Sequence, residues 1–230
     1  MTLRVTANTN KQRGTLSVSV GDIFTVCGAW RRPTTLNGGL EISIAQFTKN
    51  SGGSFDAIGK LCYYEDTIRI RSLTPTNSLA LSANEWVYLA LSIDGSSNRT
   101  LRAYSATGGT WVDVHTAAYQ SGDAWNYFLI GCIDTDTTID EGQYRGWRVF
   151  NTVLTTGELD LERASETPVK TGCVANWKLK DDLTDSVNGY TLSADDANYS
   201  FSGNAESPWL SSGASAVAPL AAAYYAQMRG

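Results

Sequence analysis

Short segments in which apolar and polar residues alternate dominate this chain up to about residue 150. In W-V-Y-L-A-L-S-I-D, which begins at Trp86, the apolar residues Val87, Leu89, Leu91 and Ile93 share one face. A period of two indicates β-strands, because successive side chains of a strand point to opposite faces. Turn sequences rich in glycine separate the segments, at Asn37-Gly38-Gly39, Ser51-Gly52-Gly53-Ser54, Asp94-Gly95, Gly108-Gly109 and Asn188-Gly189. This pattern predicts an all-β sandwich or barrel.

The other face of the segment that begins at Trp86 carries two large aromatic residues, Trp86 and Tyr88. Each large aromatic side chain can bury roughly 150–250 Å². We therefore expect this face to be either covered by a second layer or used as a binding surface.

One short helix is predicted near residues 156–165. Thr155 and Glu158 have the spacing of a capping box, in which each side chain accepts a backbone N–H bond from the other residue. Leu154 and Leu159 have the spacing of a hydrophobic staple. Thr167-Pro168 provides a stop, because the residue before proline disfavours helical backbone.

The same region contains the string Glu158-Leu159-Asp160-Leu161-Glu162, which resembles a glycosidase active site. Retaining glycosidases hold two carboxyl groups about 5 Å apart. On a strand all three carboxylates share one face, whereas on a helix Asp160 points away from Glu158 and Glu162. Since the capping box favours the helix, we expect no catalytic residues and no enzymatic activity.

Composition excludes several classes of partner. The 230 residues are 42% hydrophobic, which suits a folded globular protein, and carry a net charge of -5, which argues against nucleic acid. No apolar run is long enough to cross a membrane.

The start M-T-L-R-V lacks the apolar core of a signal peptide, so we expect synthesis in the cytoplasm. Thiols are then expected at the four cysteines, Cys27, Cys62, Cys132 and Cys173.

The order of the segments from about Ile23 to Ser202 resembles the concanavalin A-like lectin/glucanase superfamily, in its laminin-G-like and pentraxin-like branch. Phe24–Pro33 is similar to an early F-T-hydrophobic-x-x-W strand, and Tyr144–Leu154 to a late strand that ends in N-x-x-L. The other similar segments are Asn84–Leu91, Leu101–Tyr104, Leu129–Cys132, Val174–Leu179 and Asp185–Gly189. Two residues of the family pattern are missing between Gly146 and Arg148.

This resemblance implies a jelly-roll sandwich of two antiparallel sheets, with a short helix after the late N-x-x-L segment. We expect a lectin-like domain over residues 1–206. The family's glucanases carry their carboxylates on a mid-chain strand, and no such string occurs there in this sequence.

The densest group of carboxylates comprises Asp134, Asp136, Asp140 and Glu141. Hard oxygen ligands of this kind suit Ca²⁺, but Ile139 occupies the place where an EF-hand needs glycine. A calcium loop and a solvated acidic loop both remain open, and the second is favoured. No other cofactor is expected.

Residues 207–230 differ in composition from the rest of the chain, because they are small, apolar and almost uncharged. We interpret them as a C-terminal arm that contacts protein partners through its larger side chains, Pro208, Trp209, Leu210, Tyr224 and Tyr225.

Two functions follow from these features. The first is a non-catalytic, lectin-like interaction module in a larger oligomeric assembly, such as the surface of a bacteriophage virion. The second is a free carbohydrate-binding lectin, with or without calcium, that recognises cell-surface glycans. A glycoside hydrolase is a distant third.

Overall fold

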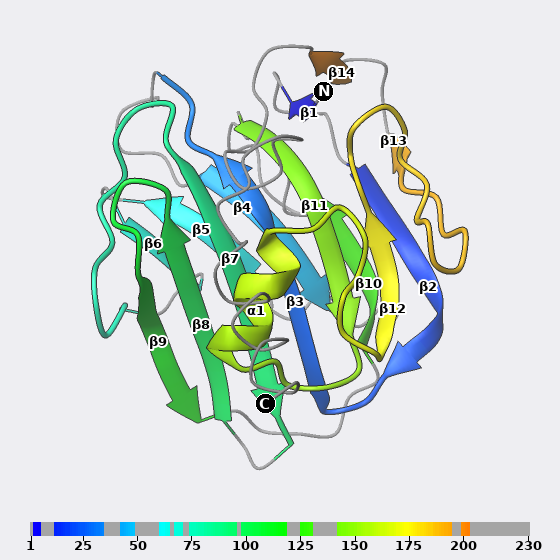
Figure 1. Cartoon of the computed structure of the whole chain (residues 1–230), viewed down its shortest axis with the longest axis horizontal. Coiled ribbons are helices and arrows are strands. Elements are labelled where there is room, and N and C mark those ends of the chain that lie inside the picture. The colour runs from blue at the N-terminus through cyan, green and yellow to red at the C-terminus, as the bar shows by residue number, and fades with distance from the viewer. Residues whose placement is uncertain are drawn as a thin grey trace, which may run out of the picture.

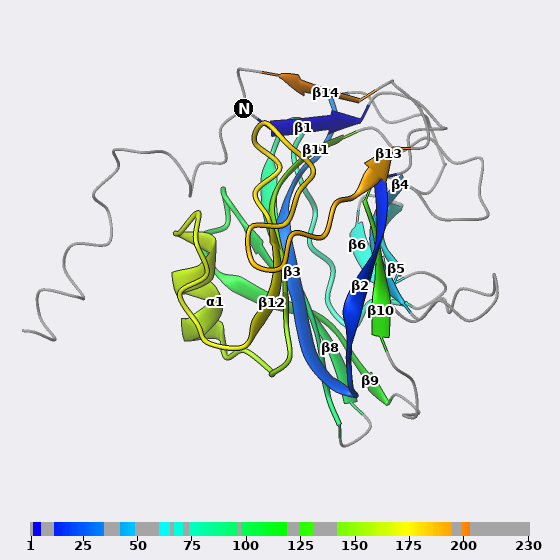
Figure 2. The ribbon, with the colours of Figure 1, turned by 90° about the vertical axis from the view of Figure 1, so that its right-hand side faces the viewer.

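The computed structural model describes residues 2–5, 12–34, 42–48, 60–64, 67–70, 74–95, 98–118, 125–130, 142–194 and 199–202. These residues form two antiparallel sheets packed face to face, with a short helix on the outside of the larger sheet (Figure 1). Figure 2 shows the two sheets edge-on and the helix beside the larger one. The prediction of an all-β sandwich with one short helix is confirmed.

The larger sheet has eight strands in the order β14-β1-β11-β3-β7-β8-β9, and β12 also pairs with β11. Its strands are β1 (Thr2–Val5), β3 (Ile23–Arg31), β7 (Trp86–Asp94), β8 (Asn98–Ser105), β9 (Trp111–Ala118), β11 (Gly142–Phe150), β12 (Cys173–Trp177) and β14 (Tyr199–Ser202). The smaller sheet has six strands in the order β13-β2-β10-β4-β5-β6. Its strands are β2 (Gln12–Val20), β4 (Ile42–Thr48), β5 (Lys60–Tyr64), β6 (Thr67–Ile70), β10 (Trp125–Ile130) and β13 (Ser193–Ala194).

Large apolar side chains fill the space between the sheets. The alternating residues predicted for the segment from Trp86, namely Val87, Leu89, Leu91 and Ile93, all lie in this core. Aromatic rings of the two sheets contact one another in this core. Phe128 of β10 stacks on Trp177 of β12 with ring centroids 4.9 Å apart. A further large ring close by is Trp147 of β11, whose centroid lies 5.7 Å from that of Phe128.

A β-bulge in β11 decides which side chains of that strand face the core. The pairing register with β3 shifts between Arg145 and Arg148, and Gly146 has a φ of +60°, which glycine adopts without strain. Tyr144 and Trp147 consequently both join the core between the sheets. Arg145 and Arg148 are buried as well, and they pair with Glu166 and Glu162 of the segment that covers the outer face.

Helix α1 (Thr156–Arg163) begins with the predicted capping box. The Thr155 side chain accepts the N–H of Glu158 at 3.3 Å, and the Glu158 carboxylate accepts the N–H of Thr155 at 2.9 Å. The helix ends at Arg163, close to the predicted limit. Within the described ranges, no helix is long and apolar enough to cross a bilayer.

Candidate functional site

Helix α1 covers the outer face of the larger sheet. Leu154 and Leu159, the two residues of the predicted staple, are fully buried in a small apolar cluster with residues of β3, β7 and β11. Trp86 and Tyr88 belong to this cluster and are 6% and 2% exposed. The sequence left open whether this face of β7 is covered by a second layer or exposed as a binding surface. At these two residues it is covered.

Glu158 lies at the N-terminus of α1 and has structural partners. Besides the capping box, its carboxylate forms an ion pair with Lys170. The hydrogen bond from Lys170, together with that from the Thr155 backbone, lowers the pKa of Glu158. A carboxylate held ionised in this way is poorly suited to act as a general acid.

Glu162 lies on the buried side of α1, where no part of its side chain is exposed. One carboxylate oxygen pairs with the guanidinium of Arg148. The other accepts the backbone N–H groups of Val169 and Lys170 at 2.9 and 2.6 Å. Glu162 thus ties the segment after the helix to β11, and it is out of reach of a sugar in solvent.

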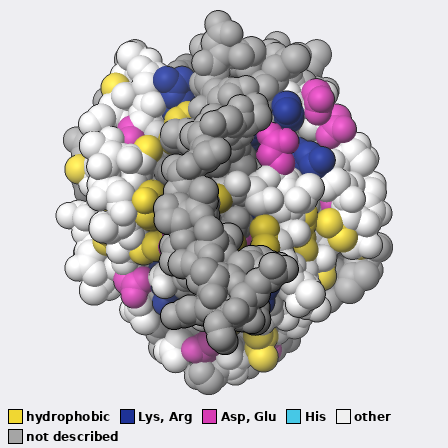
Figure 3. Space-filling view, viewed as in Figure 1, with side chains coloured by type: hydrophobic (Ala, Val, Ile, Leu, Met, Phe, Trp, Pro, Cys, Tyr) yellow, Lys and Arg dark blue, Asp and Glu magenta, His cyan; other side chains and the backbone are white. Residues whose placement is uncertain are grey.

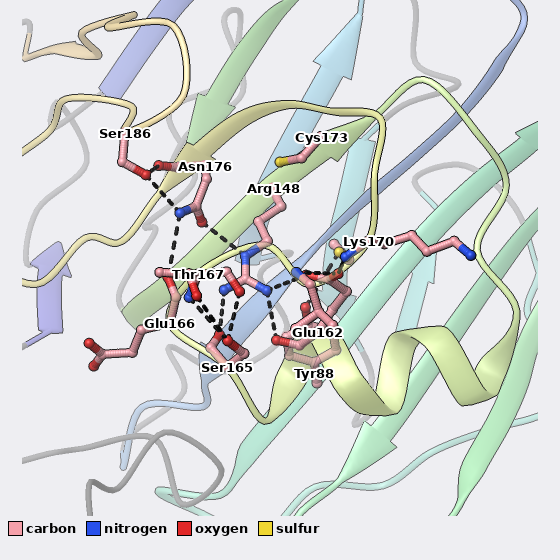
Figure 4. A network of polar contacts seen from close by, with 12 residues as sticks. Tyr88, Arg148, Glu162, Ser165, Glu166, Thr167, Lys170, Cys173, Asn176 and Ser186 are labelled. Atoms are coloured by element: carbon pink, nitrogen blue, oxygen red, sulfur yellow. Dashed lines mark hydrogen bonds and ion pairs between the residues drawn. The ribbon is translucent and has the colours of Figure 1, made fainter. Parts of the chain in front are cut away.

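The guanidinium of Arg148 likewise donates hydrogen bonds from each of its three nitrogens (Figure 4). Its Nε donates to the side-chain oxygen of Asn176 on β12 at 2.9 Å, and its Nη1 donates to the backbone oxygen of Glu162 at 2.7 Å. Its Nη2 donates to the backbone oxygen of Ser165. One arginine therefore joins β11, β12, the end of α1 and the loop that follows it.

Asp160, the third carboxylate of the string Glu158–Glu162, has different hydrogen-bond partners. It accepts hydrogen bonds from Trp111 Nε1 of β9 and from Arg163 Nε, both at 2.9 Å. Arg163 in turn lies over the ring of Tyr104, 3.9 Å from its centroid. Glu158 and Glu162 both contact Lys170, the first at its ammonium and the second at its backbone N–H, whereas Asp160 has other partners. The three carboxylates do not form the paired acids that glycoside hydrolysis needs.

Two cysteines near Arg148 are not activated nucleophiles. Tyr88 donates its hydroxyl to Cys27 Sγ at 3.4 Å. Burial raises the pKa of both Cys27 and Cys173 to about 12. A thiol with so high a pKa stays protonated near neutral pH and does not attack as a thiolate.

Asp185 organises the hairpin that follows β12. This buried carboxylate accepts the backbone N–H groups of Val187 and Asn188 at 2.9 and 2.6 Å, and that of Asn176 as well. The Asn188 side chain closes the turn by donating to the backbone oxygen of Val174 at 2.7 Å. Asp185 and Asn188, which lie in the family-like segment Asp185–Gly189, therefore have structural partners.

A shallow recess lies at the end of β12 and was not predicted. Its lining residues are Arg145, Gly146, Glu166, Lys178 and Lys180. The empty space among them measures about 180 Å³ with open solvent included, and none of it is wide enough for a water molecule. The guanidinium of Arg145 pairs with Glu166, and the ammonium of Lys180 lies 3.7 Å from the same carboxylate. The recess therefore holds three cationic side chains and one anionic side chain.

The charges in the recess act on Glu166. Partial burial works to raise its pKa, but the hydrogen bond and charge of Arg145 and the charges of Lys180 and Lys178 outweigh burial. The pKa of Glu166 is therefore lowered, and the carboxylate stays ionised at neutral pH. One sequence signal could have pointed to the recess: Gly146 interrupts the alternation of β11 directly after Arg145.

The predicted calcium residues Asp134, Asp136, Asp140 and Glu141 lie outside the described residues, as do the predicted arm residues Pro208, Trp209, Leu210, Tyr224 and Tyr225. Among the described residues, no group of three or more His, Cys, Asp or Glu side chains is placed to hold a metal ion. His115 lies buried in β9, where burial and the charge of Arg99 lower its pKa.

No family model and no curated protein matches the sequence. Solved structures do match. A Bacteroides ovatus protein provisionally described as carbohydrate-binding aligns with a TM-score of 0.60 and 12% identity over 87% of this chain, which spans 60% of that protein's length. A heptameric SAP-like pentraxin from Limulus polyphemus aligns with a TM-score of 0.52 and 12% identity, over 85% of this chain and 92% of the pentraxin. Identities this low establish a shared fold and transfer no ligand or activity.

Proposed function

Because this chain has the concanavalin A-like jelly-roll fold of laminin-G-like and pentraxin-like proteins, we propose that it is a non-catalytic, lectin-like module that binds glycans. The observation that carries this proposal is the use of the α1 carboxylates. Glu162 is fully buried against Arg148, and Glu158 is held by the helix cap and Lys170. These groups stabilise the layer that covers the sheet, which leaves recognition to surfaces elsewhere on the sandwich.

Binding is tested with a glycan array that is probed with the full chain, once with calcium and once with a chelator. We expect saturable binding to a subset of glycans. Loss of this binding in the chelator would favour the calcium loop formed by Asp134, Asp136, Asp140 and Glu141. Absence of binding under both conditions would refute the lectin function.

The absence of catalysis is tested with hydrolysis assays on the glycans that bind. We expect no turnover by the natural chain and none by the Glu158→Gln variant. Turnover that disappears in Glu158→Gln while the fold persists would show that the chain is an enzyme.

A second proposal places this lectin-like module in a larger assembly, such as the surface of a bacteriophage virion. It is supported by the composition of residues 207–230, which contain a single charged side chain, Arg229, and several large apolar ones. Apolar segments of this kind bury their surface against a partner. Deletion of residues 207–230 is expected to abolish incorporation into the assembly, and normal incorporation would refute the proposal.

A further inference from the structure

The recess at the end of β12 concentrates positive charge in an acidic protein. Arg145, Lys178 and Lys180 contribute three positive charges and Glu166 one negative charge, which leaves +2. The whole chain carries -5. Figure 3 shows basic and acidic side chains next to one another over the end of β12. Asp181 and Asp182 follow Lys180 in the chain but do not line the recess. A local excess of this sign attracts anions.

Arg145 has the geometry of a carboxylate receptor. The bulge at Gly146 fixes its position, and its side chain is only 2% exposed, so little rotational freedom remains to be lost on binding. A guanidinium presents a planar set of N–H groups that matches the two oxygens of a carboxylate. Glu166 already offers such a carboxylate from a side chain that is 39% exposed.

The two lysines reach the recess through an unusual turn. Leu179, which lies between them, has a φ of +54°, an unfavourable backbone conformation for a residue with a side chain. Its side chain is fully buried in the core, while Lys178 and Lys180 both line the recess. A hydrogen bond of 3.1 Å from Gly146 N–H to Lys178 O joins this turn to the bulge. Backbone strain of this kind concentrates at ligand-binding positions.

We infer that the recess is a subsite for the carboxylate of an acidic saccharide, and that Glu166 occupies it when no ligand is bound. The inference rests on the proposed glycan-binding function and names the class of glycan. With the Glu166 side chain in place, the recess has no free space for a second group. A ligand carboxylate would therefore enter only by displacing the Glu166 carboxylate from Arg145.

The test compares two sugars that differ in a single group. The full chain is titrated with methyl glucuronide, which carries a carboxylate, and with methyl glucoside, which does not, and NMR chemical-shift changes report binding. We expect saturable binding of the glucuronide that weakens as salt is added, and at least tenfold weaker binding of the glucoside. A sulfate titration serves as a third arm, because tighter binding of sulfate than of glucuronide would overturn the choice of a carboxylate.

Three variants connect binding to the recess. The double variant Lys178→Ala/Lys180→Ala is expected to weaken glucuronide binding at least tenfold. Glu166→Gln is expected to strengthen it severalfold, because the internal competitor loses its charge. Lys170→Ala is the matched control, since Lys170 pairs with Glu158 outside the recess, and it should bind like the natural chain.

Thermal unfolding of each variant is measured alongside, so that lost binding is not confused with a lost fold. Equal binding of both sugars, no binding of either, or unchanged binding in a folded Glu166→Gln would overturn the inference. The glycan-binding proposal is judged separately. Neutral glycans that bind on an array and are unaffected by the double lysine variant would keep that function and remove this subsite.

Discussion

The space between the two sheets is filled mainly by apolar side chains, whereas the space beneath α1 also contains a buried ion pair. Between the sheets, aromatic rings such as Phe128 and Trp177 stack within a large cluster of buried apolar side chains. Beneath α1, a buried ion pair between Arg148 and Glu162 lies beside the apolar staple residues. Apolar packing is non-directional and tolerates exchanges of similar volume. A buried ion pair is stable only when each polar atom meets its partner, so we expect it to fix how the helix docks.

Removing one partner of the buried ion pair is expected to reduce the unfolding free energy most. Arg148→Met leaves the Glu162 carboxylate buried without its counter-charge, which should cost about 3–5 kcal/mol of unfolding free energy. Urea unfolding measures the loss. The double variant Arg148→Met/Glu162→Leu should recover most of it, because neither charge is then stranded. A double variant no more stable than Arg148→Met would mean that the pair itself does not account for the cost.

In the apolar core between the sheets, the corresponding test is a substitution at Gly28. A Cβ at Gly28 would lie 2.3 Å from Cδ2 of Trp147, so Gly28→Ala must displace the core. We expect a loss of about 1–3 kcal/mol. Gly21→Ala is the control, because its Cβ would meet no heavy atom within 4 Å. Equal stability of the two variants would show that the core yields without cost.

A smaller effect is expected at the start of α1. Thr155→Ala removes the oxygen that accepts the Glu158 N–H and should cost about 1 kcal/mol. Thr155→Ser keeps that oxygen and should restore most of the stability. If both variants unfold like the natural chain, the cap does not contribute to docking of the helix.

The smallest effect concerns pH. Since the folded-state pKa of Glu158 is lowered, chiefly by Lys170, its contribution to stability is complete above the unfolded value of about 4.3. That contribution is lost as the pH falls through the folded value. Melting temperatures of the natural chain should therefore fall more steeply below about pH 5 than those of Glu158→Gln. Parallel curves for the two proteins would contradict the ion pair with Lys170.

Local sequence signals were sufficient for the elements but not for their contacts. The alternation of Val87, Leu89 and Leu91 identified a strand and its core face, and Thr155 with Glu158 identified the helix start. These patterns depend on neighbours within a few residues. The aromatic face of Trp86 and Tyr88 remained undecided, because what covers a face depends on where a distant segment docks.

The polar sites were missed for the same reason. Arg148 and Glu162 are 14 residues apart and meet only because α1 folds back over the sheet. The recess requires both the bulge at Gly146 and the left-handed turn at Leu179, and each interrupts the regular alternation on which the strand predictions rely. Nothing in the spacing of Arg145, Lys178 and Lys180 indicates that they converge.

The most direct test of whether α1 is a structural layer or a catalytic element is the unfolding free energy of Glu162→Gln beside that of Glu158→Gln. Glu162 is fully buried with Arg148, whereas Glu158 is partly exposed. We predict a loss of several kcal/mol, about 3–5, for Glu162→Gln and a loss below about 1 kcal/mol for Glu158→Gln. A Glu162→Gln protein as stable as the natural chain, but unable to cleave a glycan that the natural chain cleaves, would contradict the structural role.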